Sequence, residues 1–269
     1  MSTFMKKFKT VHPEHVSLEA HINLADKVAQ VTKLPSFLRN AQTQLDLVST
    51  GHQSSAEAYI EELIGKRAPL TQVLRMMGLM SIVGGGIKQK QFDFLRSEIV
   101  QAYGFTTLLG LDNLNRAGII IKRENRYSFS PICTAYDLIG QPVSAGSSIS
   151  LPASMHFAYH GYAPLSVRLV EASIRSGWTT EPGKAKLGLV SGQSFSKNVR
   201  PGNNASQSKK RIVLVFFIGG ITFAEISALR WLNKREDHDR EYIIMTTHIT
   251  NGHKMISAIL GNCENRYEK

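Results

Sequence analysis

Cysteine is scarce in this sequence, in which Cys133 and Cys263 are the only two thiols among 269 residues. Two thiols cannot form a disulfide framework or a thiolate zinc site, and their scarcity suits a reducing compartment. Long apolar runs are missing too, because the longest, at 212–218, has seven residues and a membrane-spanning helix needs about 20. Residues 1–11 carry three lysines without an apolar block behind them, which is not a secretory signal. These absences predict a protein of the cytosol or nucleus that does not cross a membrane.

Acidic residues are outnumbered by basic ones. The chain has 21 Asp and Glu residues against 32 Lys and Arg residues, which gives a formal charge of +11. This sign makes anionic partners the first class to consider, namely nucleic acid, acidic proteins or membrane headgroups. The 42% of hydrophobic residues are enough to build one or two globular domains.

The first half of the chain has the apolar periodicity of helices. Helices are predicted at residues 14–31, 36–47, 54–64, 70–83, 88–103 and 111–117. Pro13 would start the first of them near its first turn. Leu70, Val73, Leu74, Met77 and Met80 form one stripe of a core helix, and Phe92, Leu95, Ile99 and Ala102 form the buried stripe of the next. Apolar segments at 119–121 and 126–129, around a polar turn, then complete a winged-helix outline.

The second half has a different pattern. A helix is predicted at 165–176, and the segment 179–209 is expected to be a flexible loop, since it has few large apolar residues to bury. The run at 212–218 is typical of a strand buried on both faces of a parallel sheet. A helix at 223–232 and a second strand at 242–247 complete a β-α-β unit.

Two consequences follow from this β-α-β unit. A final helix at about 252–260 is expected to pack on the sheet, within a right-handed crossover arrangement. Two parallel strands do not form a stable domain by themselves. The strand at 212–218 therefore predicts that the chain alone is marginally stable or prone to aggregate. The predicted fold class is mixed α/β, with a mainly helical first half.

No pattern in the sequence points to catalysis, a cofactor or a metal ion. Gly219 and Gly220 lie between a strand and a helix but lack the residues of a phosphate-binding loop, and Glu225 is expected to pair locally at the helix start. His156 and His160 have the spacing of zinc ligands on a helix, but no third ligand is indicated. No nucleophile motif is present. We therefore predict no catalytic, cofactor-binding or metal-binding residues and no small-molecule substrate.

Nucleic-acid binding is the alternative that the residues themselves leave open. The winged-helix outline and the basic charge both favour it. The candidate base readers and wing residues are Asn113, Asn115, Arg116, Lys122, Arg123 and Arg126. Many winged helices instead serve to dock proteins, so this fold by itself does not decide the function.

Four blocks of the sequence, in the same order, resemble one family. They are residues 213–230 (VLVFFIGGITFAEISALR), 242–247 with Asn251 and Gly252, 160–169 (HGYAPLSVRL), and 86–118, which opens with GIKQK and contains Tyr103 and Gly104. On these residues the chain resembles the SM proteins, the SNARE-binding regulators of membrane fusion, and within them the vacuolar protein sorting branch. The resemblance extends over nearly the whole chain from about residue 4.

This resemblance implies a non-enzymatic tethering and fusion factor of the HOPS and CORVET complexes, located in the cytoplasm and held on late endosomes, lysosomes or vacuoles by its partners. It implies that the chain corresponds to the C-terminal part of an SM protein. Residues 1–32 would end a helical hairpin that templates SNAREs, with residues 4–31 as one arm. Residues 33–160 would form a helical, winged-helix-like domain, and residues 161–269 the last part of an α/β domain with the loop 179–209.

The resemblance also implies a partner surface, because the helical third domain of the vacuolar SM protein docks on a helical tethering-complex subunit, the sixteenth sorting protein. The matching stretch surrounds the end of the helix at 88–103. Aromatic residues and arginine are enriched at the centres of interfaces. The predicted partner-binding residues are Arg96, Tyr103, Phe105 and Leu108, whereas Leu109 is expected to fill the core.

Overall fold

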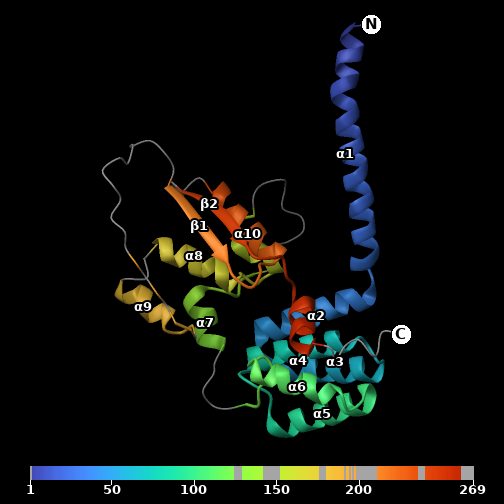
Figure 1. Ribbon diagram of the computed structural model, residues 1–269, viewed down its shortest axis with the longest axis vertical. Coiled ribbons are helices and arrows are strands. Elements are labelled where there is room, and N and C mark those ends of the chain that lie inside the picture. The colour runs from blue at the N-terminus through green and yellow to red at the C-terminus, as the bar shows by residue number, and fades with distance from the viewer. Residues whose placement is uncertain are drawn as a thin grey trace. The chain divides into compact units, whose positions relative to one another are not determined.

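A computed structural model describes residues 2–123, 129–141, 152–175, 180–190, 192, 193, 195, 197, 211–235 and 240–261 (Figure 1), with the backbone alone for residues 2–11 and 175. The chain divides into two compact units, Met1–Gln44 and Leu45–Lys269. The mixed α/β class predicted from the sequence is confirmed, with helices dominating and one small parallel sheet.

The first unit consists of helix α1 (Ser2–Thr32) and most of α2 (Pro35–Thr50). Pro13 lies inside α1, so the prediction that proline starts this helix is wrong. α1 leaves apolar side chains exposed along much of its length, namely Val16, Leu18, Ile22, Leu24, Val28 and Val31. A helix with so much exposed apolar surface is typical of a segment that packs against other helices in a complex.

The second unit contains a helical bundle of α3 (Gln53–Gly65), α4 (Leu70–Gly84), α5 (Gln89–Tyr103) and α6 (Thr107–Arg116). The stripe predicted on α4 is confirmed, since all five of its members are buried in one core. Gly85, in the left-handed region at φ 64°, ends α4 as a glycine without steric cost. On α5, Phe92, Leu95 and Ile99 face the same core.

The winged-helix outline is only partly present. The predicted strand at 119–121 does not form. The neighbouring Lys122 makes an isolated parallel bridge with Ile87, and Ile120 is buried. Residues 126–128 of the predicted second strand lie outside the described residues, and Phe129 begins helix α7 (Phe129–Tyr136). The prediction that Phe129 belongs to a strand is therefore wrong.

The predicted β-α-β unit is confirmed. Strands β1 (Arg211–Phe217) and β2 (Arg240–Thr246) pair in parallel, with Val213 opposite Tyr242, and helix α10 (Phe223–Lys234) connects them. Figure 1 shows the two strands side by side with α10 along them. The elements η1 (Met155–Tyr159) and α8 (Leu165–Arg175) precede β1 in the sequence.

Part of the segment predicted to be a loop is helical. Helix α9 spans Glu181–Leu187, and the Thr180 hydroxyl accepts a hydrogen bond from the Gly183 amide at its start. A threonine cap and an acidic first turn are sufficient local signals for a short helix. The prediction of a loop over 179–209 was thus wrong for α9, because it considered only the shortage of apolar residues.

The sheet is buried on one face only. Val213, Val215 and Phe217 pack into a core with α8 and α10, whereas Ile212, Leu214 and Phe216 are exposed. The prediction of burial on both faces is therefore wrong for this chain. The physical reason is that no described element covers the second face.

The last helix, α11 (Gly252–Leu260), packs on α4 and α6, which corrects the prediction that it packs on the sheet. Its residues Ile256 and Leu260 are buried in the core of the bundle. The Asn113 side-chain amide donates to the Ile259 carbonyl over 3.3 Å. A β-carbon added at Gly110 would lie 2.5 Å from Leu260 Cδ2, so α11 approaches α6 as closely as glycine permits.

We expect Gly110→Ala to lower the free energy of unfolding by about 1–3 kcal/mol, because the added methyl group overpacks the contact with Leu260. Urea denaturation followed by circular dichroism would measure this loss. Gly65→Ala is the matched control, since a β-carbon there meets nothing within 4 Å. Shortening Leu260 to alanine should reduce the penalty of Gly110→Ala in a double-mutant cycle. An additive cycle would contradict this account.

A second prediction concerns Cys133, which is buried on α7. Burial raises the pKa of its thiol from 9.0 to about 11. In a Cys263→Ser variant, alkylation of the folded chain at pH 8 should be at least about 100-fold slower than in urea, since only the thiolate reacts. Equal rates in both conditions would show that this thiol is not buried.

Candidate partner-binding surface

The end of α5 is held firmly in the bundle. The Tyr103 hydroxyl donates to the Ala68 carbonyl over 2.6 Å, and the side chain is 8% exposed. Burial raises the pKa of Tyr103, so the hydroxyl keeps its proton for this bond. Of the four residues predicted to bind a partner, Tyr103 thus faces the core. The anchored Tyr103 fixes the point at which the chain leaves α5.

Gly104 ends α5 and reverses the direction of the chain at φ 88°, a conformation that suits glycine. Phe105 follows and is 80% exposed. Leu108 is half-buried, and Leu109 is 66% exposed. The prediction that Leu109 fills the core is therefore wrong.

Thr107, rather than Leu109, is the buried residue at the start of α6 (Thr107–Arg116). It is 1% exposed, and its hydroxyl donates to the Gly104 carbonyl over 2.6 Å, so its polar atom is satisfied without water. Because Thr107, Gly110, Leu111 and Leu114 form the buried face of α6, the helical repeat turns Leu109 outward.

A hollow of about 420 Å³ lies where α5 meets the start of α6. Its walls are formed by Asp93, Arg96, Ser97, Val100, Gln101, Phe105 and Leu108. The structure thus brings three of the predicted residues, Arg96, Phe105 and Leu108, to one place. We call these seven residues the α5–α6 hollow.

The α5–α6 hollow has two charged residues, Asp93 and Arg96, which differ in the contacts they make within the chain. Asp93 accepts a hydrogen bond from the Gln89 side chain over 2.6 Å and lies 3.8 Å from the Lys122 ammonium. Arg96 is exposed and makes no hydrogen bond or ion pair within the described part of the chain. The guanidinium is therefore available to an acidic group of a partner.

Four members of the hollow escaped the sequence prediction, namely Asp93, Ser97, Val100 and Gln101. The signal was present, because residues 93, 96, 97, 100 and 101 share the face of α5 opposite its buried stripe. What the sequence could not show is that Phe105 and Leu108 return to this face after Gly104.

The turn at Gly219 and Gly220 leads to a helix start that is already occupied. The Thr222 hydroxyl accepts from the Glu225 amide, and the Glu225 carboxylate accepts from the Thr222 amide over 2.8 Å. The prediction that Glu225 pairs locally is confirmed. This capping box places a carboxylate where a phosphate would bind.

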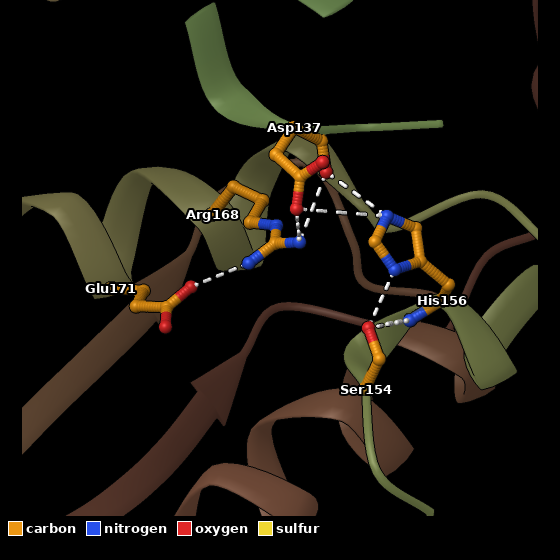
Figure 2. Close-up of polar contacts among 5 residues, drawn as sticks. All are labelled: Asp137, Ser154, His156, Arg168 and Glu171. Atoms are coloured by element: carbon orange, nitrogen blue, oxygen red, sulfur yellow. Dashed lines mark hydrogen bonds and ion pairs between the residues drawn. The ribbon is translucent and has the colours of Figure 1, made fainter. Parts of the chain in front are cut away.

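His156 is buried and belongs to a polar cluster, shown in Figure 2, that reaches the surface at Asp137. Its Nε2 lies 3.1 Å from the Asp137 carbonyl and its Nδ1 lies 2.5 Å from the Ser154 hydroxyl. Since a carbonyl only accepts, Nε2 donates to Asp137, and in the neutral imidazole Nδ1 then accepts from the serine. Both nitrogens are thus used, and His160 sits in the left-handed region after η1. In the described part of the chain no group of three potential ligands could hold a metal ion.

Arg168 joins the same cluster from α8 (Figure 2). One guanidinium nitrogen donates to the Asp137 carbonyl over 2.9 Å and to its carboxylate over 2.8 Å, and the other donates to Glu171 over 2.9 Å. Asp137 itself has φ 50°, a conformation that costs about 1 kcal/mol or more outside glycine. The cluster stabilises this turn and joins α7, η1 and α8.

Three of the six candidate nucleic-acid readers, Asn113, Arg116 and Lys122, make side-chain interactions within the chain. Asn113 donates to Ile259 and Arg116 forms an ion pair with Asp112 over 2.9 Å. Lys122 lies over the Phe92 ring at 5.0 Å. Arg126 lies outside the described residues. No described helix combines the length and the apolar character that crossing a bilayer requires.

Comparison with known proteins gives a consistent result. The Sec1 family model matches residues 1–258. The vacuolar protein-sorting-associated protein 33 homolog of Arabidopsis thaliana is 35% identical over 271 residues, which cover 97% of this chain and 44% of that protein. Vacuolar protein sorting-associated protein 33A of Rattus norvegicus is 33% identical, and the match covers 96% of this chain and 43% of the rat protein.

Vacuolar protein sorting-associated protein 33 of Schizosaccharomyces pombe is also 33% identical. That match covers 98% of this chain and 46% of the S. pombe protein. The chain therefore spans less than half the length of the curated relatives it matches.

Proposed function

This chain belongs to the Sec1 family, and from that premise we propose that it regulates SNARE-mediated tethering and fusion of vesicles in endosomal and vacuolar sorting, by binding proteins and without catalysis. The names of the relatives, which describe vacuolar protein sorting, support the pathway. The observation that carries the proposal is the α5–α6 hollow, with an exposed aromatic ring and a free arginine on a rigid helical bundle.

The proposed partners are of two kinds. A helical subunit of the HOPS and CORVET complexes, the sixteenth sorting protein, would bind at the α5–α6 hollow, with Phe105 and Leu108 as apolar anchors and Arg96 at the rim. SNARE helices would bind along α1. The exposed apolar side chains of α1 support this second assignment, since apolar surface left open to water favours contact with a partner.

The proposed location follows from the partners. The chain would be peripheral on late endosomes, lysosomes or vacuoles, held there by the tethering complex. We further propose the division into residues 1–32, 33–160 and 161–269. The end of α1 at Thr32 supports the first boundary. In this division α11 belongs to the last segment but packs on α4 and α6 of the segment 33–160.

A binding experiment tests this function directly. Purified chain should capture the helical subunit and the cytosolic part of its SNAREs from separate pure solutions. Capture of the helical subunit should survive a rise from low to physiological salt, because its contact is largely apolar, whereas nucleic-acid binding would weaken steeply. Salt-sensitive binding to nucleic acid, with no capture of either protein, would overturn the proposal.

A further inference from the structure

One stretch of the sequence holds more than half of the formal charge of +11. No Asp or Glu occurs at 182–224. Seven basic residues lie in the same range, namely Lys184, Lys186, Lys197, Arg200, Lys209, Lys210 and Arg211. A positive charge concentrated in this way, without acidic residues to offset it, attracts an anionic partner.

Helix α9 presents the first of these basic residues on the surface (Figure 1). Val190, just after α9, packs against the core that α7 and α8 form, so α9 is attached to this core. Lys184 and Lys186 are exposed. Lys184 forms an ion pair with Glu181 over 3.0 Å, whereas the Lys186 ammonium makes no hydrogen bond or ion pair with another described group. The charge of Lys186 is therefore open to an external anion.

Large apolar side chains lie in water within the same segment. Leu189 is 43% exposed and Phe195 is 88% exposed. Lys197 follows two residues after the phenylalanine and is exposed as well. We call Lys184, Lys186, Leu189, Phe195 and Lys197 the basic segment. Lysines mixed with exposed leucine and phenylalanine are typical of polypeptide that lies on a membrane surface.

We propose that the basic segment binds directly to the surface of a bilayer that contains anionic lipids. Its lysines would contact the headgroups, while Phe195 and Leu189 enter the boundary between headgroups and acyl chains. An ammonium group suits this role because it is a compact charge that does not require a fixed geometry of its partner. This contact is additional to the attachment through partner proteins proposed above and does not depend on it.

Two other anionic partners fit the basic segment less well. Its cations are all lysines, and lysine is depleted at protein interfaces, where arginine is enriched. Single-stranded nucleic acid stacks successive bases on several aromatic side chains, but Phe195 is the only aromatic residue at 182–215. A fluid layer of headgroups over an apolar interior needs neither feature.

Flotation of the full chain with vesicles tests this proposal, because flotation separates bound chain from aggregates. Vesicles of phosphatidylcholine with about one third phosphatidylserine should carry at least about 10-fold more chain than phosphatidylcholine alone. High salt should reverse this binding, since it screens exposed charges. Lys186→Gln combined with Lys197→Gln should lower the affinity about 25-fold, or about fivefold for each lysine. Lys90→Gln, an exposed lysine of α5, is the matched control and should not change it.

Two variants of Phe195 separate insertion from attraction between charges. Phe195→Trp should give a blue-shifted emission on anionic vesicles, relative to the unchanged chain, because the indole enters an apolar layer. Phe195→Ser should lower the affinity about tenfold, since it removes the largest apolar side chain of the segment. Phe94→Ser, which changes an exposed phenylalanine of α5, should leave the affinity unchanged.

Three results would overturn the proposal, provided that every variant keeps the circular dichroism spectrum of the unchanged chain. Equal binding to neutral and anionic vesicles would mean that apolar surface elsewhere, such as the exposed face of the sheet, makes the contact. Vesicle binding that persists in the Lys186 and Lys197 double variant, with no change in the emission of Phe195→Trp, would exclude the basic segment. Binding of a single-stranded oligonucleotide through these two lysines, without binding to vesicles, would assign the segment to nucleic acid.

Discussion

Phe105→Asp is expected to abolish binding to the helical tethering subunit, with a loss of affinity of at least about 100-fold. The Phe105 side chain is exposed in the free chain and lines the α5–α6 hollow, so the substitution replaces an apolar anchor with a carboxylate that loses its water when a partner binds. Leu108→Lys should act in the same way. A pull-down with the pure subunit, followed by titration calorimetry, would measure the loss.

Two controls make this prediction specific. Phe94→Asp changes an exposed aromatic residue of α5 that lies outside the hollow, and it should leave binding unchanged. Arg96→Asp should weaken binding by only about 10-fold, because rim charges contribute less than buried anchors. Binding that persists in Phe105→Asp, or a loss accompanied by collapse of the helical spectrum, would show that the surface is wrongly placed.

Arg168→Met is expected to lower the free energy of unfolding by about 3–5 kcal/mol, since it breaks a largely buried ion pair and removes a charged donor from the Glu171 carboxylate in a desolvated site. The Arg168 side chain is 15% exposed and that of Glu171 is 7% exposed. The substitution would also remove both hydrogen bonds to Asp137. Urea denaturation at pH 7, followed by the fluorescence of Trp231 in the same core, would report the change.

The chain offers a matched control for Arg168. Lys184 and Glu181 form an ion pair with the same spacing over 3.0 Å, but both side chains are largely exposed. Lys184→Met should therefore change stability by less than about 1 kcal/mol. Equal losses in the two variants would mean that the buried cluster has no special role in holding α7, η1 and α8 together.

Local patterns in the sequence were enough to predict the elements whose burial repeats regularly. The stripe on α4 and the β1–α10–β2 unit are of this kind, because side-chain periodicity directly reflects the face that is buried. Part of the α5–α6 hollow was also accessible from the sequence, since an aromatic residue and a leucine after Gly104 exceed what a connection needs, and both residues line the hollow.

The errors arose where a tertiary contact decides between local alternatives. Leu109 was wrongly expected in the core because the predicted helix began at residue 111, whereas α6 begins at Thr107 and its helical repeat turns Leu109 outward. For α11, a short apolar face cannot indicate which of two cores it enters. Nor could periodicity show that one face of β1 remains uncovered, since that depends on which other elements are present.

The return of α11 to the bundle has a consequence for how the chain folds during synthesis. Ile259 meets Asn113 across 146 residues of sequence, and Leu260 fills the space above Gly110. While the ribosome makes the intervening α/β segment, α4 and α6 must wait with an apolar surface open to water. Contacts that join distant parts of a chain slow folding and lengthen exposure to aggregation. A chaperone that binds apolar surfaces would therefore meet this bundle after α6 emerges and release it once α11 is made.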